Sequence, residues 1–512
     1  MPKRFEFGSV DLTAGENPSA ARPLSETPFC VAILGDFSGR GSRGLNDAKT
    51  IGERRPLLVD RDNFDQVLAG LKVELHLPTE ERVPIVFRFS ELDDFHPDRL
   101  FEHSAFNKLR DLRGRLQNPS TFSQVAAELS LSPPPPQVAE RKVETPVAAA
   151  PSAVRLASGS LLDDMIEQTE ARISTDRQTR KPDEVLAFAR QLAAKYAVSA
   201  PDPRRPEFVA AVDRAVADVM RTLLHNPDFQ ALEAIWRAIF LLVRQIETGP
   251  ELKLCLFDIS QEELASDLSS SADLRSTGVF RLLVEKGIQT PGADPWAVVV
   301  GNYSFGPGKG DLELLARMAK VAHAAQAPFL AEGNSLLLGA ASFATAPNFR
   351  DWNRTAEQGQ WDELRGLPES DSVGLALPRF LLRLPYGEKT SPAEAFDFEE
   401  FAGPPDHKGY LWGNPAFVVA LLLAESFSAS GWEMRPGSVS QIDKLPLHIY
   451  GMAGQSESKP CAEALFTEDT VQRILEDGLI PLVSFKGRDS VRIARFQSIA
   501  QPPRPLGGRW AH

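Results

Sequence analysis

The sequence predicts an α/β protein made of two fused modules, each with a mixed sheet and packed helices. The 512 residues are 43% hydrophobic and 24% charged, which is ordinary for globular proteins and sufficient for a large core. Apolar runs typical of buried strands alternate with segments of helical periodicity, which favours largely parallel sheets covered by helices. Between the modules, four consecutive prolines (Pro133 to Pro136) stand in a stretch without apolar periodicity and indicate a semi-rigid linker.

These patterns divide the chain into four parts. Residues 1–130 form the first module, residues 131–158 the linker rich in proline and alanine, residues 159–205 a helix with a connector, and residues 206–512 the second module. A chain of this length is expected to contain about three domains, which agrees with this division.

The first module is expected to begin with a buried strand. The segment PFCVAILGDF, from Pro28 to Phe37, is apolar as far as Gly35 and Asp36, and a glycine-rich loop follows it. We then expect a short strand at 57–59, a short helix at 60–70, a strand at 83–89 with phenylalanines on one face, and a closing helix at about 101–116.

The part after the linker opens with a predicted amphipathic helix, SLLDDMIEQTEARI. Ser160 can cap this helix, and Asp163 occupies its third position. Its apolar stripe consists of Leu161, Leu162, Met165, Ile166 and Thr169. Because linker precedes the helix and polar residues follow it, the helix has little obvious core of its own.

The second module is expected to start with a helix pair and to continue as alternating strands and helices. Pro227 is well placed at the first position of the second helix, directly after Asn226. Strand signals lie at LKLCLFDIS, WAVVVGNYSF, SLLLGAASF, LPLHIYG and LIPLVSF, with helices predicted from Glu262 and from Leu312 to Ala325.

The known sequence motifs of catalysis and metal binding are incomplete or missing in this sequence. The segment GNYSFGPGKGD (301–311) lacks the first glycine of a phosphate loop and has Gly310 where serine or threonine should bind magnesium. No G-x-S-x-G or H-E-x-x-H motif occurs, and the eight histidines are scattered. Acidic pairs such as Asp93–Asp94 and Glu399–Glu400 are expected to be solvated. We therefore predict no enzymatic activity, no cofactor and no metal.

Charge and cysteine content narrow the classes of partner. A net charge of -13 argues against a sequence-independent hold on nucleic acid. The N-terminus lacks an apolar signal segment, and no window reaches the roughly 18 apolar residues of a membrane span. Cys30 and Cys255 lie in strand-like runs, as expected of buried thiols in a reducing compartment. We expect a cytoplasmic protein that binds neither nucleic acid nor membrane.

Motifs in both modules resemble the contractile sheath proteins of type VI secretion systems. The first module is similar to the small subunit, known as TssB, VipA or ImpB, in the blocks at 28–39, 59–65 and 93–97, which contain Asp36, Asp60, Asp62 and Phe64. The second module resembles the large subunit, known as TssC, VipB, ImpC or EvpB. Its matching blocks lie at 161–163, 228–237, 327–329, 375–387 and 410–414, and contain Trp236, Arg237, Pro378, Arg379, Arg383, Pro385, Tyr386, Trp412 and Asn414.

The resemblance implies a mechanical function. In this family small and large subunits pair, stack around an inner tube and contract to inject effectors. The expected partners are copies of the chain or other sheath subunits, an inner-tube protein, a baseplate and a AAA+ unfoldase of the ClpV type. Neighbouring protomers exchange strands, and the segment from Lys3 to Leu12, with Phe5, Phe7 and Val10, alternates well enough for this role. An edge strand of its own domain is the other interpretation of that segment.

The resemblance also suggests roles for two further features. The helix with Leu161, Leu162, Asp163, Met165 and Ile166 matches the handle that the unfoldase binds, although it could instead pack on its own domain. Arg379 and Arg383 are expected to form stabilising pairs with acidic neighbours. A fused chain would also keep the two subunits in a one-to-one ratio.

Two departures from the family leave an alternative open. Large subunits continue for roughly another domain beyond the region where this chain stops, and Asn302 replaces an acidic residue of a family motif. The chain could therefore be a sheath accessory or adaptor that caps, nucleates or regulates without polymerising. A hydrolase without a known motif is a third reading.

Overall fold

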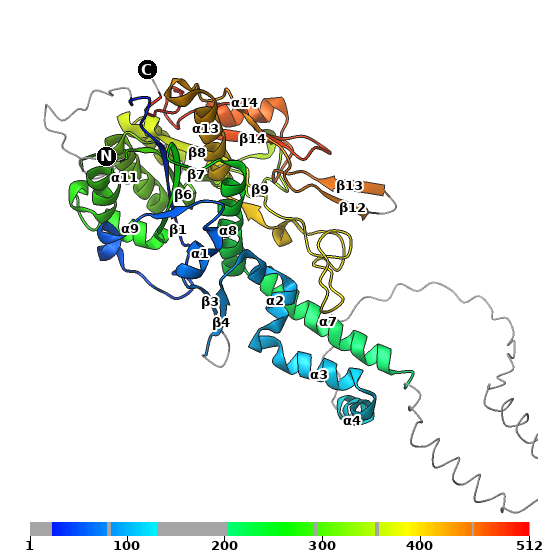
Figure 1. Ribbon diagram of the computed structural model, residues 1–512. Helices are drawn as coiled ribbons and strands as arrows, with labels where there is room; N and C mark the ends of the chain where they lie inside the picture. The colour runs from blue at the N-terminus through cyan, green and yellow to red at the C-terminus, as the bar shows by residue number, and fades with distance from the viewer. Residues whose placement is uncertain are drawn as a thin grey trace, which may run out of the picture. The chain divides into compact units, whose positions relative to one another are not determined.

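The computed structural model describes residues 23–78, 83–130, 202–289, 294–353, 358–452 and 455–510 (Figure 1). These residues belong to two compact units, of which the larger combines Met1–Leu109 with Asp213–His512 and the smaller consists of Arg110–Val212. The predicted strand at 3–12, the linker and the helix at 160–173 lie outside the described residues. The boundaries predicted from the sequence therefore stay a prediction.

A nine-stranded mixed sheet forms the centre of the larger unit (Figure 1). The strand order is β11-β15-β14-β8-β7-β6-β1-β5-β2. Neighbours from β14 through β5 run parallel, whereas β2, β15 and β11 pair antiparallel at the two edges. The strands are β1 (Phe29–Gly35), β2 (Leu57–Val59), β5 (Leu252–Asp258), β6 (Trp296–Phe305), β7 (Phe329–Gly333), β8 (Val373–Leu377), β11 (Gln441–Ile442), β14 (Ile480–Ser484) and β15 (Val491–Ile493).

Helices cover both faces of this sheet. One face of β1, with Cys30, Ala32 and Leu34, shares a core with residues of α9, α11, α12 and α14. On the other face Phe29 contacts Phe427 of α13, and their ring centroids lie 4.9 Å apart. The helices are α1 (Phe64–Gly70), α2 (Pro97–Glu102), α3 (Asn107–Gln117), α4 (Pro119–Ser130), α7 (Arg205–Leu224), α8 (Pro227–Gln245), α9 (Gln261–Ser269), α10 (Gly278–Phe280), α11 (Lys309–Ala325), α12 (Gln358–Arg365), α13 (Ala416–Ser430) and α14 (Glu468–Glu476), and Arg281–Gln289 form a π-helix.

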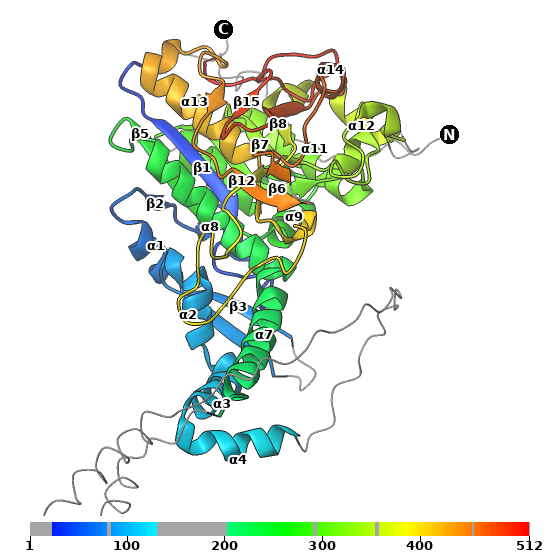
Figure 2. The ribbon, with the colours of Figure 1, turned by 90° about the vertical axis from the view of Figure 1, so that its right-hand side faces the viewer.

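The strand order shows that the two halves of the sequence share the large sheet. The predicted α/β class and the mixed sheet are confirmed, but β1 and β2 do not form a sheet confined to the first module. All seven residues of β1 are buried, so this strand needs a strand on each side and helices on both faces. The second half of the chain supplies these neighbours: β5 on one side and β6 on the other (Figure 2).

Among the described residues of the larger unit, three two-stranded sheets accompany the large one. The first module keeps one of its own, in which β3 (Val73–Leu77) pairs with β4 (Ile85–Phe89). In the second half β9 (Phe380–Leu381) pairs with β10 (Trp412–Gly413), and β12 (His448–Met452) pairs with β13 (Gln455–Lys459).

Two local predictions need correction. The closing helix of the first module is broken into α2 and α3, because the ring of His103 accepts a hydrogen bond from the Ala105 backbone and caps a new helical turn. The segment SLLLGAASF is not a strand: Asn334 caps a 3-10 turn at Ser335–Leu338, directly after β7 ends at Gly333. By contrast, α8 begins at Pro227 with Asn226 as its cap, as the sequence predicts.

The most apolar helix of the described residues is a core helix. By length and composition Ala416–Glu433 is the one described segment that could cross a membrane, but 67% of it is buried inside the protein. It packs against β1, β6, β7 and β8 of the large sheet. In the smaller unit, Phe122 of α4 and Phe208 of α7 meet edge to face with ring centroids 5.8 Å apart.

Candidate functional site

Inside the larger unit, residues 23–109 of the first module contact residues 213–510 of the second over an extended surface, which we call the junction. Its first component is backbone pairing. β1 pairs with β5 from Phe29 opposite Leu252 to Gly35 opposite Asp258, and with β6 on its other edge. Loss of β1 would leave the facing backbone groups of two strands without partners, which is costly inside a protein.

The second component is a carboxylate at the end of β5. Asp258 accepts hydrogen bonds from the backbone N–H of Phe37 at 2.9 Å and of Ser38 at 3.1 Å. It also accepts one from the Ser38 hydroxyl at 2.7 Å. The turn that follows β1 is therefore held by the neighbouring strand of the other module.

Glu263 forms the third component and binds two arginines of the first module. Its side chain is fully buried, and its Oε1 lies 2.7 Å from both Arg40 Nη2 and Arg54 Nη2. The backbone N–H of Asp47 donates to the same oxygen at 2.9 Å. Burial alone would raise the pKa of Glu263, but the hydrogen bonds from Arg54, Arg40 and the backbone lower that pKa to about 2.

Replacing Glu263 by glutamine is expected to lower the free energy of unfolding by about 2–4 kcal/mol at pH 7. The folded-state pKa lies below the ordinary value of 4.5, so the carboxylate stabilises the fold above about pH 4.5. This contribution, about 3 kcal/mol, is lost as the pH falls toward 2. Urea unfolding at several pH values measures it.

Glu262→Gln is the matched control, because the neighbouring Glu262 is exposed on the same helix. This control should unfold like the unchanged protein between pH 3 and 7. Equal stability of the Glu263 and Glu262 variants would contradict the role of Glu263 at the junction.

Aromatic packing is the fourth component and unites two residues predicted from the family motifs. Trp236 is fully buried in α8, and its Nε1 donates to the Phe37 carbonyl at 3.0 Å. The centroid of its ring lies 5.7 Å from the ring centroids of both Phe37 and Phe64. Phe64 and Trp236 thus come from different modules and touch one another in the core.

A buried network of charges surrounds Arg383. Its guanidinium contacts Glu233 at 2.8 Å and Glu400 at 2.7 Å, and the side chains of both glutamates are fully buried. Arg237 contacts Glu233 at 2.6 Å and donates to the Tyr386 hydroxyl at 3.0 Å. Three predicted motif residues, Arg237, Arg383 and Tyr386, therefore belong to one network.

The pKa values in the network follow from burial and pairing. Burial would raise the pKa of Glu400, but the charge of Arg383 and hydrogen bonds to the carboxylate lower it to about 2. Burial raises the pKa of Tyr386 to about 12, so the phenol stays neutral. The expectation that Glu399–Glu400 is a solvated pair is wrong for Glu400, because this side chain faces Arg383 in the interior.

The first module reaches this network through the block at 93–98. The Tyr386 hydroxyl lies 3.5 Å from the Phe95 carbonyl, and the ring of His96 stands edge-on to the Tyr386 ring. Asp98 accepts hydrogen bonds from the backbone N–H groups of Glu394 and Ala395. Two blocks that resemble different subunits are therefore in direct contact.

The remaining motif residues stabilise local structure. The carboxylates of Asp36 and Asp60 accept hydrogen bonds from backbone N–H groups of their own loops. The backbone N–H of Asp62 donates a hydrogen bond to the Asp60 carboxylate.

The motif residues of the second module do the same. Pro378 directly follows the last residue of β8. Arg379 forms an ion pair with Glu463 at 2.6 Å, and the Pro385 carbonyl accepts a hydrogen bond from the Thr390 hydroxyl. Trp412 donates to the His407 carbonyl, and Asn414 bonds to the Tyr303 carbonyl and the Ala416 N–H.

Other predicted site residues cannot be placed. Leu161, Leu162, Asp163, Met165 and Ile166, like Phe5, Phe7 and Val10, lie outside the described residues. Sequence reasoning missed Arg40, Arg54, Asp258 and Glu263. Their signal is weak, since Arg40 and Arg54 are single charged residues in loops, Asp258 ends a strand, and Glu263 lies in the first turn of α9. The partners are also more than 200 positions apart along the chain.

The polar groups of the junction bind one another. Across the described ranges, no group of three histidine, cysteine, aspartate or glutamate side chains could hold a metal ion. The three cysteines are free and buried, and burial raises the pKa of Cys255 to about 11, so the thiolate is disfavoured. The arrangement suits the mechanical union of two chain segments.

Comparison with known proteins gives matches to both regions. The family model described as "EvpB/VC_A0108, tail sheath N-terminal domain" matches residues 206–500. The model described as "Type VI secretion system, VipA, VC_A0107 or Hcp2" matches residues 11–129. The chain is 32% identical over 303 residues to the type VI secretion system sheath protein TssC1 of Pseudomonas aeruginosa. This alignment covers 57% of the chain and 61% of the relative, so the chain spans about three fifths of the relative's length.

Proposed function

The chain belongs to the tail sheath family of type VI secretion systems, and we propose that it is a structural subunit of a contractile sheath. In this proposal the regions similar to VipA and VipB form one building block within a single chain. The main support is the position of β1, a strand of the VipA-like region that pairs with β5 and β6 of the VipB-like region.

A preformed block of this kind suits a sheath that transmits force. The pairing of the central strand, the Glu263 ion pairs and the contacts of Phe95 and His96 with Tyr386 would all have to break before the two regions separate. These subunits would stack around an inner tube on a baseplate, in the cytoplasm, and contract to drive effector injection. The role would be structural, without catalysis, since the polar groups of the junction are paired with one another.

Electron microscopy tests the proposal. The purified full-length chain, alone and mixed with sheath subunits from the same organism, is examined by negative stain, and its mass is measured over a concentration series. A sheath subunit should form rings, tubes or cogwheel particles, or enter those formed by its partners. A chain that stays monomeric alone and is excluded from partner assemblies would instead support the role of a non-polymerising adaptor.

The segment at 161–166 is proposed as the handle for a ClpV-type unfoldase. Leu162→Asp places a charge on the apolar stripe that a binding groove would have to cover, so it should abolish capture of the unfoldase in a pull-down. Ala171→Asp adds the same charge on the opposite face of the predicted helix and should leave capture intact. Unchanged capture by the Leu162 variant would refute the handle.

A further inference from the structure

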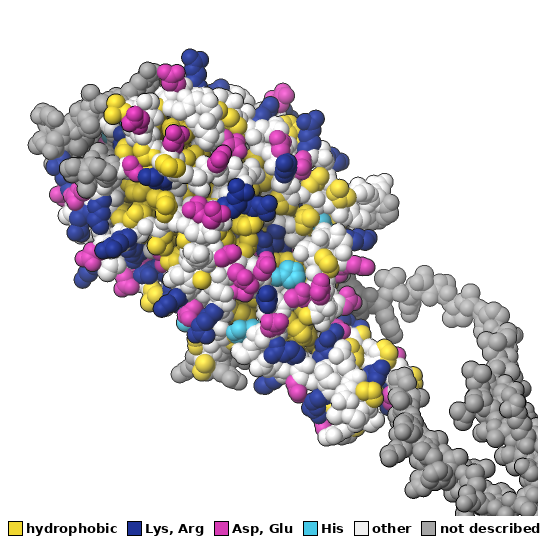
Figure 3. Space-filling view, viewed as in Figure 1, with side chains coloured by type: hydrophobic (Ala, Val, Ile, Leu, Met, Phe, Trp, Pro, Cys, Tyr) yellow, Lys and Arg dark blue, Asp and Glu magenta, His cyan; other side chains and the backbone are white. Residues whose placement is uncertain are grey.

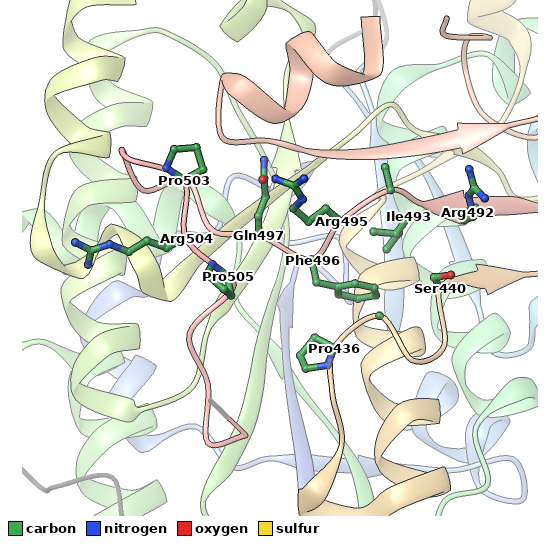
Figure 4. A pocket seen from close by; sticks show the side chains of 12 residues that line it. Pro436, Ser440, Arg492, Ile493, Arg495, Phe496, Gln497, Pro503, Arg504 and Pro505 are labelled. Atoms are coloured by element: carbon green, nitrogen blue, oxygen red, sulfur yellow. The ribbon is translucent and has the colours of Figure 1, made fainter. Parts of the chain in front are cut away.

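A pocket at one edge of the large sheet carries positive charge in an acidic protein. It has a volume of about 780 Å³ and is lined by residues of the segments 436–440, 492–497 and 503–505. These lining residues include Arg492, Arg495 and Arg504 and contain no aspartate or glutamate. Figure 4 shows Arg492 and Arg495 on one side of the pocket and Arg504 extending on the other. We call this surface the arginine pocket.

Two of these arginines have no acidic partner within the part of the chain that the structure describes. Arg492 stacks on the ring of Phe485, with its guanidinium carbon 5.5 Å from the ring centroid. Arg495 is exposed and forms no ion pair with a described residue. Arg504 lies 4.0 Å from Asp371, the outer limit of an ion pair. The pocket therefore presents cations that are available to an anionic group from outside.

A loop elsewhere on the same molecule carries the opposite charge. The segment GEKTSPAEAFDFE, residues 387–399, contains four acidic residues and one lysine, and we call it the acidic loop. Phe396 and Phe398 are buried, which holds Glu394 and Asp397 in exposed positions between and beside them. Neither Glu394 nor Asp397 forms an ion pair with a described residue. Figure 3 shows acidic side chains gathered around this part of the surface.

The rigidity of the acidic loop makes it a suitable binding surface. The Asp98 carboxylate accepts hydrogen bonds from the backbone N–H groups of Glu394 and Ala395, at 3.0 and 2.9 Å. Within the loop, the Glu399 carboxylate accepts a hydrogen bond from the backbone N–H of Glu388. Because the loop is already ordered, little conformational entropy would be lost when its carboxylates bind.

The two surfaces lie at different ends of the larger unit. In Figures 1 and 2 the acidic loop lies toward α2 and β3, whereas β15 and the C-terminal segment lie at the opposite end. The loop of one copy therefore cannot reach its own pocket. A contact between two different surfaces of identical chains is heterologous and continues from copy to copy into a ring or filament.

We infer that the arginine pocket of one copy of this chain receives the acidic loop of a second copy. The inference rests on the proposed function, because it names the surfaces through which sheath subunits would adjoin. With a net charge of -13 each, two copies repel one another over most of their surface. An exposed group of unpaired arginines is where such copies can approach, and the pairing would set their relative orientation.

Charge reversal in the full-length chain tests the contact. The pocket variant is Arg492→Glu with Arg495→Glu, and the loop variant is Glu394→Arg with Asp397→Arg. Each variant alone should self-associate about tenfold more weakly than the unchanged protein in sedimentation velocity at low salt, as expected for the loss of two exposed ion pairs. An equimolar mixture of the two variants should regain association, because the reversed pocket matches the reversed loop. Association of the unchanged protein should weaken with added salt.

Lys108→Glu with Lys408→Glu is the matched control, since both lysines are exposed and lie outside the two surfaces. It changes the net charge as much as the pocket variant and should associate like the unchanged protein. Circular dichroism checks that each variant is folded. If the pocket variant is not folded, the single substitution Arg495→Glu replaces it in the experiment.

Three results would overturn the inference: full association of the pocket variant, no recovery in the mixture, or no self-association of the unchanged protein at low salt. The first two, obtained with particles visible in the microscope, would leave the proposed sheath function intact. Exclusion of the unchanged protein from every sheath assembly would remove that function separately.

Discussion

Replacing Arg383 by alanine is expected to lower the free energy of unfolding by about 3–5 kcal/mol. The substitution leaves Glu233 and Glu400 buried without the cation that lies 2.8 and 2.7 Å from them. A buried carboxylate without a partner must either stay charged in an environment of low polarity or take up a proton. Arg383 also stacks over the Tyr386 ring at 4.2 Å, and this packing is lost as well.

Urea unfolding followed by tryptophan fluorescence measures the effect of the Arg383 substitution. Because the pKa of Glu400 is lowered to about 2 in the folded protein, its pairing stabilises the fold above about pH 4.5 and is lost as the pH falls toward 2. The Arg383 variant should therefore lose much of its deficit in acid. An equal deficit at pH 7 and pH 3 would show that lost packing, and not lost charge pairing, accounts for the effect.

Arg379→Ala is the matched control. Arg379 pairs with a single glutamate, and 37% of its side chain is exposed. Water can replace part of that interaction, so we expect a loss of about 1 kcal/mol. A loss as large as that of the Arg383 variant would contradict the special role of the buried network.

Cutting the chain between the two regions should leave them bound to one another. We expect a protein with a protease site inserted between residues 131 and 158 to elute as one species after cleavage, because β1 remains paired between β5 and β6. Separation should require denaturant, as the fragments would have to expose seven buried residues of β1 and the ion pairs of Glu263. Size-exclusion chromatography with mass measurement follows the outcome.

A chain that lacks residues 1–109 provides the complementary measurement. Without β1, the strands β5 and β6 lose their common neighbour and expose unpaired backbone edges, which favours aggregation. We expect this chain to be insoluble when expressed alone and to be rescued by co-expression of the missing region. Fragments that separate in native buffer, or a soluble monomeric second region, would show that the two regions fold independently.

The α/β class could be predicted because strands and helices leave local signals in the sequence. β1 is an uninterrupted apolar run, and Asn226–Pro227 is a strong start signal for α8. These patterns depend on neighbours a few residues apart, so the sequence displays them directly. The resemblance to sheath subunits likewise rested on short blocks such as those around Trp236 and Tyr386.

The pairing of β1 with strands of the other region could not be predicted from the sequence in the same way. An apolar run indicates that a strand is buried on both faces, but it does not specify which strands will pair with it. The linker suggested two separate modules, since composition reveals where regular patterning stops and not whether the flanking segments meet again.

An α/β protein with two sheath-like regions and no known catalytic motif can be recognised from the order of the amino acids alone. The shared sheet of the two regions, the burial of Glu400 against Arg383 and the binding of Arg40 and Arg54 by Glu263 become visible in the folded protein. The difference arises from distance along the chain. Hydrophobic periodicity and capping act between near neighbours, whereas strand pairing and buried ion pairs join residues whose proximity exists only after the chain has folded.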